Sequence, residues 1–342
     1  MHRNTKLLAV AAICLSSLST QAIARDDLSI IGSRTVAPYA ELVAAEFAKQ
    51  GGFAKPEIAE SNTTQAFKHF CRGVGNLYPD VAMASRPIKG AETEDCKAHG
   101  VEGITEIKIG YDGVLLAYRG DSGFGEFSLS GKQLWLAMSK SVPVNGAMAA
   151  NPYKNWNDID PSLPASPILF FLPEKGVAMR DLFGDLVLKP VCADEPAIAA
   201  LAEDAREEAC LAPREDGAIL DFAVSRDALT ALAESSDQPM AITNVQLIST
   251  TPEAKGVQLV KLDGVAPETS TIASGEYKAS RSHYLYVKNQ HIGQVPGVME
   301  FVSAFLSDAA QGPDGYLIKM GWIPLKDEER KELMARAKSL LN

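Results

Sequence analysis

The chain has 342 residues, and its 43 acidic and 33 basic side chains give a formal net charge of −10. An acidic chain without a run of Lys and Arg lacks the basic surface of a nucleic-acid-binding protein, so we predict no nucleic-acid partner. Acidity does not exclude a small anionic ligand, because backbone dipoles and one or two arginines can hold one locally. The length exceeds that of one hydrophobic core and predicts two lobes.

The first 24 residues have the pattern of a secretory signal peptide. Arg3 and Lys6 precede an apolar run over 7–18, and a small-x-small site ends at Ala24. We therefore expect cleavage after Ala24 and export of the mature chain. Loss of the two basic residues changes the net charge from −10 to −12. No later apolar run approaches the roughly 18 residues that a membrane-spanning helix requires.

Residues 28–38 predict a strand, a polar turn and a helix. An apolar strand over 28–31 leads into a Gly-Ser-Arg-Thr turn, and Pro38 suits the first turn of a helix. The helix has one apolar face, formed by Tyr39, Leu42, Val43 and Phe47. Free N–H groups at a helix start, beside hydroxyl side chains, can bind an anion. The alternative interpretation is an ordinary helix cap by Ser33 or Thr35.

Two further polar loops follow candidate strands. The strand over 56–59 is followed by Ser-Asn-Thr-Thr and a helix, and the strand over 80–84 ends in Ser85-Arg86-Pro87. Strands that alternate with helices predict a mostly parallel sheet. Ligands bind at the carboxyl ends of such strands, so we expect the loops 32–35, 61–64 and 85–86 to converge.

The remaining elements predict a second lobe. The apolar stretch 107–117 reads as one long strand that crosses into it, and 284–287 reads as the return strand. We therefore expect lobe I over 25–115 plus 286–342 and lobe II over 116–285. Further strands and helices are expected at 168–172, 177–188, 195–212, 226–236, 296–308 and from Asp327. Two crossings describe a hinged clamp, and the alternative is a two-domain protein without hinge motion.

Four cysteines remain in the mature chain, at Cys71, Cys96, Cys192 and Cys210. An even count in an exported protein predicts two disulfides, and three pairings are possible. Short local loops favour Cys71–Cys96 and Cys192–Cys210. Zinc is disfavoured because the chain has no Cys-x-x-Cys motif and its histidines are not clustered. We expect no metal and no cofactor.

In order and spacing, the motifs resemble those of the periplasmic phosphate-binding proteins of ABC importers, in their type II two-lobed form. The matching stretches are 32–38, 67–75, 84–89, 110–113, 214–218, 271–277 and 312–316. The resemblance implies an α/β fold with two mixed, mostly parallel sheets joined by a two-strand hinge. It also implies a periplasmic monomer that carries phosphate, or a related oxyanion, to an inner-membrane ABC permease.

Position by position, the resemblance assigns ligand contacts to loops from both lobes. These residues are Ser33, Thr35, the backbone of Val36, Thr63, Ser85, Arg86 and Arg180. An arginine can bind two oxygens of a tetraoxyanion through parallel N–H bonds. Asp112 is a further candidate, which could orient Arg86, accept a proton from the anion or form a salt bridge at the hinge.

Two loops depart from the family pattern. The family has Gly-Thr-Gly-Gly-Gly where this chain has Asn-Thr-Thr-Gln-Ala at 62–66, and Ser-Gly-Thr where this chain has Val-Ala-Met at 177–179. Each lost hydroxyl contact to a charged oxygen is worth about 1.5–3 kcal/mol. Two such losses would weaken binding by about two to four powers of ten. The departures thus predict weak phosphate binding or a different small anion, such as a carboxylate.

An enzyme is the third hypothesis. Gly-Asp-Ser-Gly at 120–123 is similar to the nucleophile loop of serine proteases, but no histidine has a supporting context. A secreted phosphatase would need a nucleophile–base pair or a metal cluster, and the sequence indicates neither. We therefore predict a binding protein without enzymatic activity.

Overall fold

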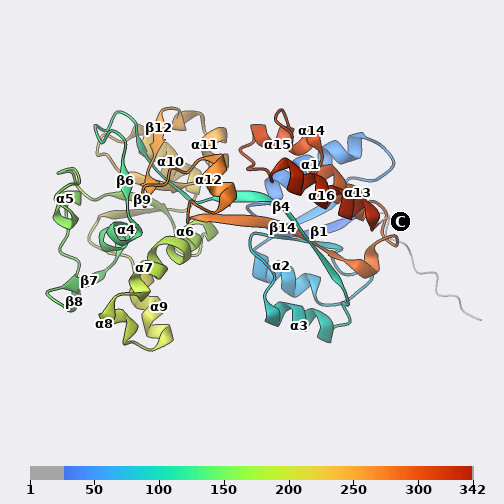
Figure 1. The fold of residues 1–342 in the computed structure, drawn as a ribbon, viewed down its shortest axis with the longest axis horizontal. Coiled ribbons are helices and arrows are strands. Elements are labelled where there is room, and N and C mark those ends of the chain that lie inside the picture. Colours follow the sequence, from blue (N-terminus) through green and yellow to red (C-terminus); the bar gives the residue numbers. More distant parts are fainter. Residues whose placement is uncertain (1–26, 341–342) are drawn as a thin grey trace, which may run out of the picture.

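The computed structural model describes residues 27–340. The expected signal peptide and its cleavage site therefore lie outside the described residues. Two α/β lobes lie side by side and are joined by extended strands (Figure 1). Each lobe is built on a five-stranded sheet in which four strands run in one direction and one is reversed. The two-lobed α/β class predicted from the sequence is confirmed.

The sheet of lobe I has the order β2-β1-β3-β14-β4, with β14 as the reversed strand. Its strands are β1 (Ser29–Ser33), β2 (Glu57–Ser61), β3 (Val81–Ala84), β4 (Ile104–Gly113) and β14 (Ser280–Lys288). Alternate residues of β3 face opposite sides: Val81 and Met83 pack beneath α1 and α13, and Ala82 and Ala84 pack beneath α2. The helices of this lobe are α1 (Ala37–Lys49), α2 (Thr63–Phe70), α3 (Gly90–Ala98), α13 (Val298–Phe305), α14 (Asp308–Gln311), α15 (Tyr316–Lys319), α16 (Asp327–Ser339) and the 3₁₀ turn η3 (Asn289–His291).

The sheet of lobe II has the order β10-β9-β11-β5-β12, with β5 reversed. Its strands are β5 (Leu115–Arg119), β9 (Phe170–Pro173), β10 (Ile219–Phe222), β11 (Met240–Thr243) and β12 (Val257–Leu259). Two small ribbons pair β6 (Ser128–Leu129) with β13 (Lys261–Leu262) and β7 (Ser141–Val144) with β8 (Ala147–Ala150). Its larger core includes Trp135, Trp156 and Phe170, all fully buried.

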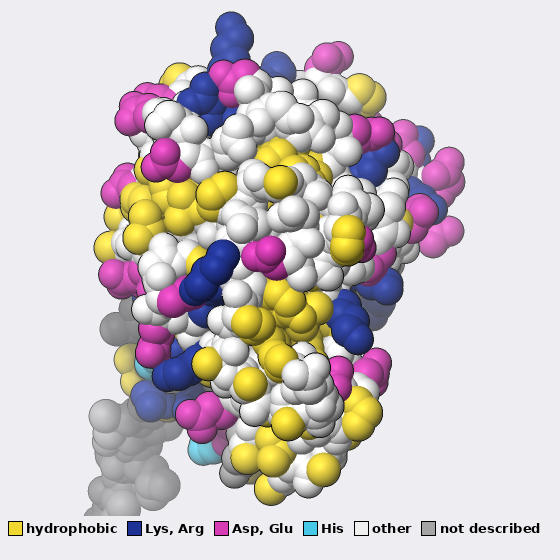
Figure 2. All heavy atoms as spheres, turned by 90° about the vertical axis from the view of Figure 1, so that its left-hand side faces the viewer, with side chains coloured by type: hydrophobic (Ala, Val, Ile, Leu, Met, Phe, Trp, Pro, Cys, Tyr) yellow, Lys and Arg dark blue, Asp and Glu magenta, His cyan; other side chains and the backbone are white. Residues whose placement is uncertain are grey.

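Helices cover both faces of the lobe II sheet (Figure 1). They are α4 (Gly131–Met138), α5 (Trp156–Ile159), α6 (Ala178–Phe183), the π-helical turn η1 (Gly184–Leu188), α7 (Lys189–Ala193), α8 (Pro196–Ala199), α9 (Glu203–Leu211), α10 (Ser225–Glu234), α11 (Val245–Thr250), the 3₁₀ turn η2 (Pro252–Ala254) and α12 (Thr269–Ser274). On the outer face of lobe II, basic side chains are scattered among acidic ones and form no broad basic patch (Figure 2).

The two lobes are connected where the sequence indicated, but the strand boundaries differ. The stretch 107–117 was expected to be one strand; instead β4 ends at Gly113 and β5 begins at Leu115, and the two strands belong to different sheets. The return strand is longer than expected, because the polar residues from Ser280 pair with the end of β4. Val114 donates its N–H to Ala279 O at 2.8 Å and joins the two connections. The limits of the two lobes stay a prediction.

The expected helix over 195–212 is divided into α8 and α9. The Cys192–Cys210 disulfide holds the two Cα atoms 5.5 Å apart. A straight helix would separate residues 18 positions apart by about 27 Å, so the chain must turn between them. The second disulfide joins Cys71 and Cys96, after α2 and within α3. The described residues contain no group of three or more possible metal ligands and no helix that could cross a membrane.

Candidate anion-binding site

Three polar loops begin side by side at the carboxyl ends of β1, β2 and β3. In the parallel register, Ser33 lies opposite Ser61, and Gly32 lies opposite Met83. Arg34 donates its backbone N–H to Ser61 O at 3.0 Å, which joins the first two loops. Gly32 is required here because a Cβ atom would lie 2.1 Å from Met83 O. The convergence expected from the sequence therefore occurs at this edge of lobe I.

A shared hydroxyl group joins the second and third loops. Thr63 Oγ1 lies 3.1 Å from Ser85 Oγ and accepts the backbone N–H of Ser85 at 3.1 Å. Thr63 begins α2, whose start is capped by the Asn62 side chain accepting from the N–H of Gln65. Thr63 is buried and Ser85 is half-buried. Two predicted ligand residues from different loops thus meet at the start of a helix.

The hydroxyls of the first loop face each other. Ser33 Oγ and Thr35 Oγ1 lie 2.7 Å apart. Helix α1 begins after Val36 and has no side-chain cap, so neither hydroxyl has the simple capping role that was the alternative interpretation. The N–H of Val36 donates to Ser33 O at 2.9 Å. In this conformation that N–H is engaged within the loop.

Arg86 is held by a carboxylate that the sequence analysis missed. Its two terminal nitrogens donate to Glu92 at 2.6 and 2.8 Å, and one also donates to Thr64 Oγ1 at 3.1 Å. Glu92 also accepts the N–H of Lys89 at the start of α3. Burial raises the pKa of Glu92, but the bonds from Arg86 and Lys89 outweigh it and lower the pKa overall. Glu92 is the third residue of α3, and because the N-cap residue Lys89 has no acceptor side chain, the sequence shows no capping-box signature that would have revealed it.

Asp112 lies at the hinge and forms an ion pair there. It accepts from Arg281 on β14 at 3.1 Å, and His283 Nε2 is 3.9 Å away. Burial raises the pKa of Asp112 despite the nearby guanidinium. Burial and the charge of Arg281 lower the pKa of His283 well below its usual value. Of the three roles considered for Asp112, this geometry corresponds to the salt bridge at the hinge.

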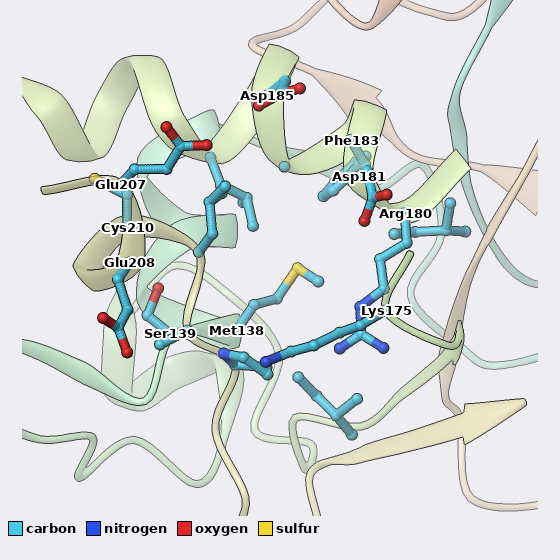
Figure 3. A pocket seen from close by; sticks show the side chains of 17 residues that line it. Met138, Ser139, Lys175, Arg180, Asp181, Phe183, Asp185, Glu207, Glu208 and Cys210 are labelled. Atoms are coloured by element: carbon cyan, nitrogen blue, oxygen red, sulfur yellow. The ribbon is translucent and has the colours of Figure 1, made fainter. Parts of the chain in front are cut away.

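Arg180 lies in lobe II, apart from the three loops of lobe I. It belongs to the first turn of α6, is buried, and donates to Pro173 O at 2.9 Å and to Asp221. It also lines a pocket within lobe II (Figure 3). The structure therefore places Ser33, Thr35, Val36, Thr63, Ser85 and Arg86 at one edge of lobe I, and it places Arg180 in the other lobe.

One electrostatic interaction links these regions of the two lobes. Asp185 in η1, which directly follows α6, has a pKa raised by burial and by neighbouring carboxylates. The charge of Lys89 opposes this increase, although Lys89 lies in lobe I just after the Arg86 loop. The start of α3 and the α6–η1 segment are therefore near enough to interact.

The family model and the relatives that match this chain point to the same family. A family model for the PBP superfamily domain matches residues 19–309. Protein SphX of Synechococcus elongatus is 25% identical over 343 residues, covering 95% of this chain and 86% of SphX. The phosphate-binding protein PstS of Staphylococcus haemolyticus is 25% identical over 291 residues, covering 84% of this chain and 79% of PstS.

Two solved structures have a similar fold. A possible phosphate binding protein from Planctomyces limnophilus superposes with a TM-score of 0.64 at 21% identity, over 92% of this chain and 99% of the other. A putative phosphate ABC transporter substrate-binding protein with bound phosphate from Clostridium perfringens gives a TM-score of 0.56 at 21% identity, over 88% and 100%. The two-lobed fold and the family model over most of the chain show that this protein belongs to the PBP superfamily.

Proposed function

We propose that this protein captures phosphate between its two lobes and delivers it to an ABC importer. The observation that carries the proposal is the meeting of three hydroxyl-bearing strand-end loops at one edge of lobe I, with Arg86 beside them. The relatives named as phosphate-binding proteins match 84% to 91% of the chain and support the same ligand. We further propose export to the periplasm with cleavage after Ala24, a monomeric carrier, and an inner-membrane permease as its partner.

The proposed mechanism is closure of the lobes over the anion. Hydroxyl groups of the three loops would donate to phosphate oxygens, and helix starts would add backbone N–H donors and a favourable dipole. Glu92 would keep the Arg86 guanidinium oriented, because bidentate pairing fixes its plane. The start of α6 and Arg180 would complete the site from lobe II. The short connections at Val114 and Ala279 would serve as the hinge.

Calorimetric titration of the mature protein with phosphate, sulfate and a panel of carboxylates tests this function. We expect saturable phosphate binding that is lost in Arg86→Ala. The matched control is Arg119→Ala, because Arg119 also pairs with a single carboxylate, Asp121, but lies at the end of β5 in lobe II. A folded protein that binds a carboxylate and ignores millimolar phosphate would contradict the proposal. Turnover of a chromogenic phosphate ester would instead support the phosphatase hypothesis.

A further inference from the structure

The first loop at the edge of lobe I carries an arginine that has no role in the proposed mechanism. Arg34 lies between Ser33 and Thr35, two of the residues that we propose bind phosphate. Its backbone N–H donates to Ser61 O at 3.0 Å, which fixes the residue between the first and second loops. Arg34 is exposed, and its side chain makes no hydrogen bond or ion pair within the described residues. The guanidinium is therefore available to a ligand at this edge.

The other arginines near the proposed site are already balanced by carboxylates. The pairs are Arg86–Glu92 in lobe I, Arg281–Asp112 at the hinge and Arg180–Asp221 in lobe II. Each pair is neutral as a whole when both of its groups are charged, so the three arginines together add little net charge for an anion. Arg34 adds a positive charge that no carboxylate of the described residues balances by pairing with it.

The position of Arg34 near two helix starts makes a positive charge unfavourable there. Helix α1 begins at Ala37, three residues later, and α2 begins at Thr63, beside the loop that Arg34 contacts. The two helices lie on opposite sides of the lobe I sheet (Figure 1). A helix start carries a partial positive charge, which acidic residues in the first turn can balance. Neither α1 nor α2 has an acidic residue in its first turn. Arg34 therefore adds to a potential that is already positive.

Two other unpaired arginines of the described residues have a more favourable position. Arg72 follows the end of α2, and Arg336 lies in the last turn of α16; the side chains of both make no hydrogen bond or ion pair within that part of the chain. The end of a helix carries a partial negative charge and stabilises a cation. Arg34 lacks this compensation, which indicates that a bound anion supplies it.

We propose that Arg34 contacts the bound anion and gives the site a preference for a doubly charged oxyanion over a singly charged one. This inference rests on the proposed function and adds a residue and a charge class to it. A guanidinium can donate two parallel N–H bonds to oxygens of a tetraoxyanion. These donors would replace some of those that the loops 62–66 and 177–179 lack. At a given distance, the Coulomb attraction of one positive charge is twice as large for a dianion as for a monoanion.

Phosphate titrations of the full mature protein at two pH values test this preference. Phosphate is a dianion well above its second pKa and a monoanion well below it. Arg34→Gln should weaken binding by about tenfold or more for the dianion and by about threefold for the monoanion, because the lost Coulomb free energy is halved. Comparison of the variant with the wild type at the same pH cancels the titration of other protein groups. Equal fold losses at the two pH values, or unchanged affinity for the dianion, would overturn the inference.

Two further variants control for net charge and for the shape of the side chain. Arg72→Gln removes the same charge from the same lobe at the far end of α2, and it should leave both affinities within about twofold of wild type. Arg34→Lys keeps the charge and should keep the preference for the dianion, although loss of the planar fork should weaken binding by about threefold. A preference lost as fully in Arg34→Lys as in Arg34→Gln would contradict the role of the charge. Urea unfolding of Arg34→Gln should match that of the wild type, because the side chain bonds to no described residue.

The wild-type titration reports separately on the proposed function. Saturable phosphate binding by the wild type, with unchanged affinity in Arg34→Gln, would overturn this inference and leave the proposed function standing. A folded wild-type protein that binds no phosphate would overturn both, whether or not it binds a carboxylate.

Discussion

The shared hydroxyl of Thr63 gives the sharpest test of the lobe I site. Thr63→Val keeps the shape of the side chain but removes an oxygen that lies 3.1 Å from both Ser85 Oγ and Ser85 N. The backbone N–H of Ser85 then has no acceptor at that position. The change therefore disturbs the junction of two loops without opening a cavity.

The expected magnitudes follow from the contacts. Loss of the acceptor for a part-buried N–H should lower the free energy of unfolding by about 1–3 kcal/mol. If the same hydroxyl donates to a phosphate oxygen, its loss should cost a further 1.5–3 kcal/mol or so of binding free energy. That cost corresponds to a dissociation constant larger by about 10- to 150-fold.

Thr105→Val is the control that separates the effect of a lost hydroxyl on stability from its effect on phosphate binding. Thr105 is also a buried hydroxyl of the same sheet, 5% exposed, and donates to Asn289 Oδ1 at 2.7 Å. It lies near the start of β4, at the opposite edge of the sheet from the loops. Urea unfolding should show similar losses for both variants, and calorimetry should show weaker phosphate binding for Thr63→Val alone. Wild-type phosphate affinity in a folded Thr63→Val protein would refute the reasoning.

Three further predictions concern stability. Asp216→Asn should lower the free energy of unfolding by about 3 kcal/mol, because the buried Arg214 loses a bidentate partner; urea titration measures the loss. Bonds from Arg214 hold the pKa of Asp216 far below its usual range. The wild type should therefore keep this stabilisation above about pH 4 and lose it on further acidification. If Asp216→Asn lost the same amount of stability over this pH range, the loss could not be assigned to protonation of Asp216. Replacing Cys192 and Cys210 by Ser should cost about 3 kcal/mol in the same unfolding assay, and reduction of the wild type, which breaks both disulfides, should cost more than that. Gly32→Ala should abolish soluble expression, because its Cβ would lie 2.1 Å from a carbonyl oxygen of the neighbouring strand, and a stable soluble variant would argue against that packing.

Local patterns predicted the strand–loop–helix units of lobe I well. Strands followed by hydroxyl-bearing loops identify β1, β2 and β3, and predicted helices follow the first two loops, because each unit is specified within about 20 neighbouring residues. Helix α3, which follows the third loop and buries only Cys96, was not predicted. Glu92 lies only six residues after Arg86, but no local signature marked it, because Lys89 at the N-cap of α3 has no acceptor side chain.

Contacts between segments that are distant along the chain could not be predicted from sequence patterns. Arg281 lies 169 residues after Asp112, and only the pairing of β14 with β4 brings the two side chains together. The same long-range pairing extends β14 back to Ser280, although Ser280-Arg281-Ser282 lacks the apolar pattern of a strand.

The sequence by itself indicated the strands and polar loops of lobe I and their convergence at parallel strand ends, and it favoured the two local disulfide loops, because each depends on residues that are close along the chain. Tertiary structure alone decided the partners of the charged groups: Glu92 for Arg86, Arg281 for Asp112 and Asp221 for Arg180. A buried charge takes the nearest counter-charge that the packed chain provides. Which charge is nearest depends on strand register and on the placement of helices, and no pattern of neighbouring residues contains that information.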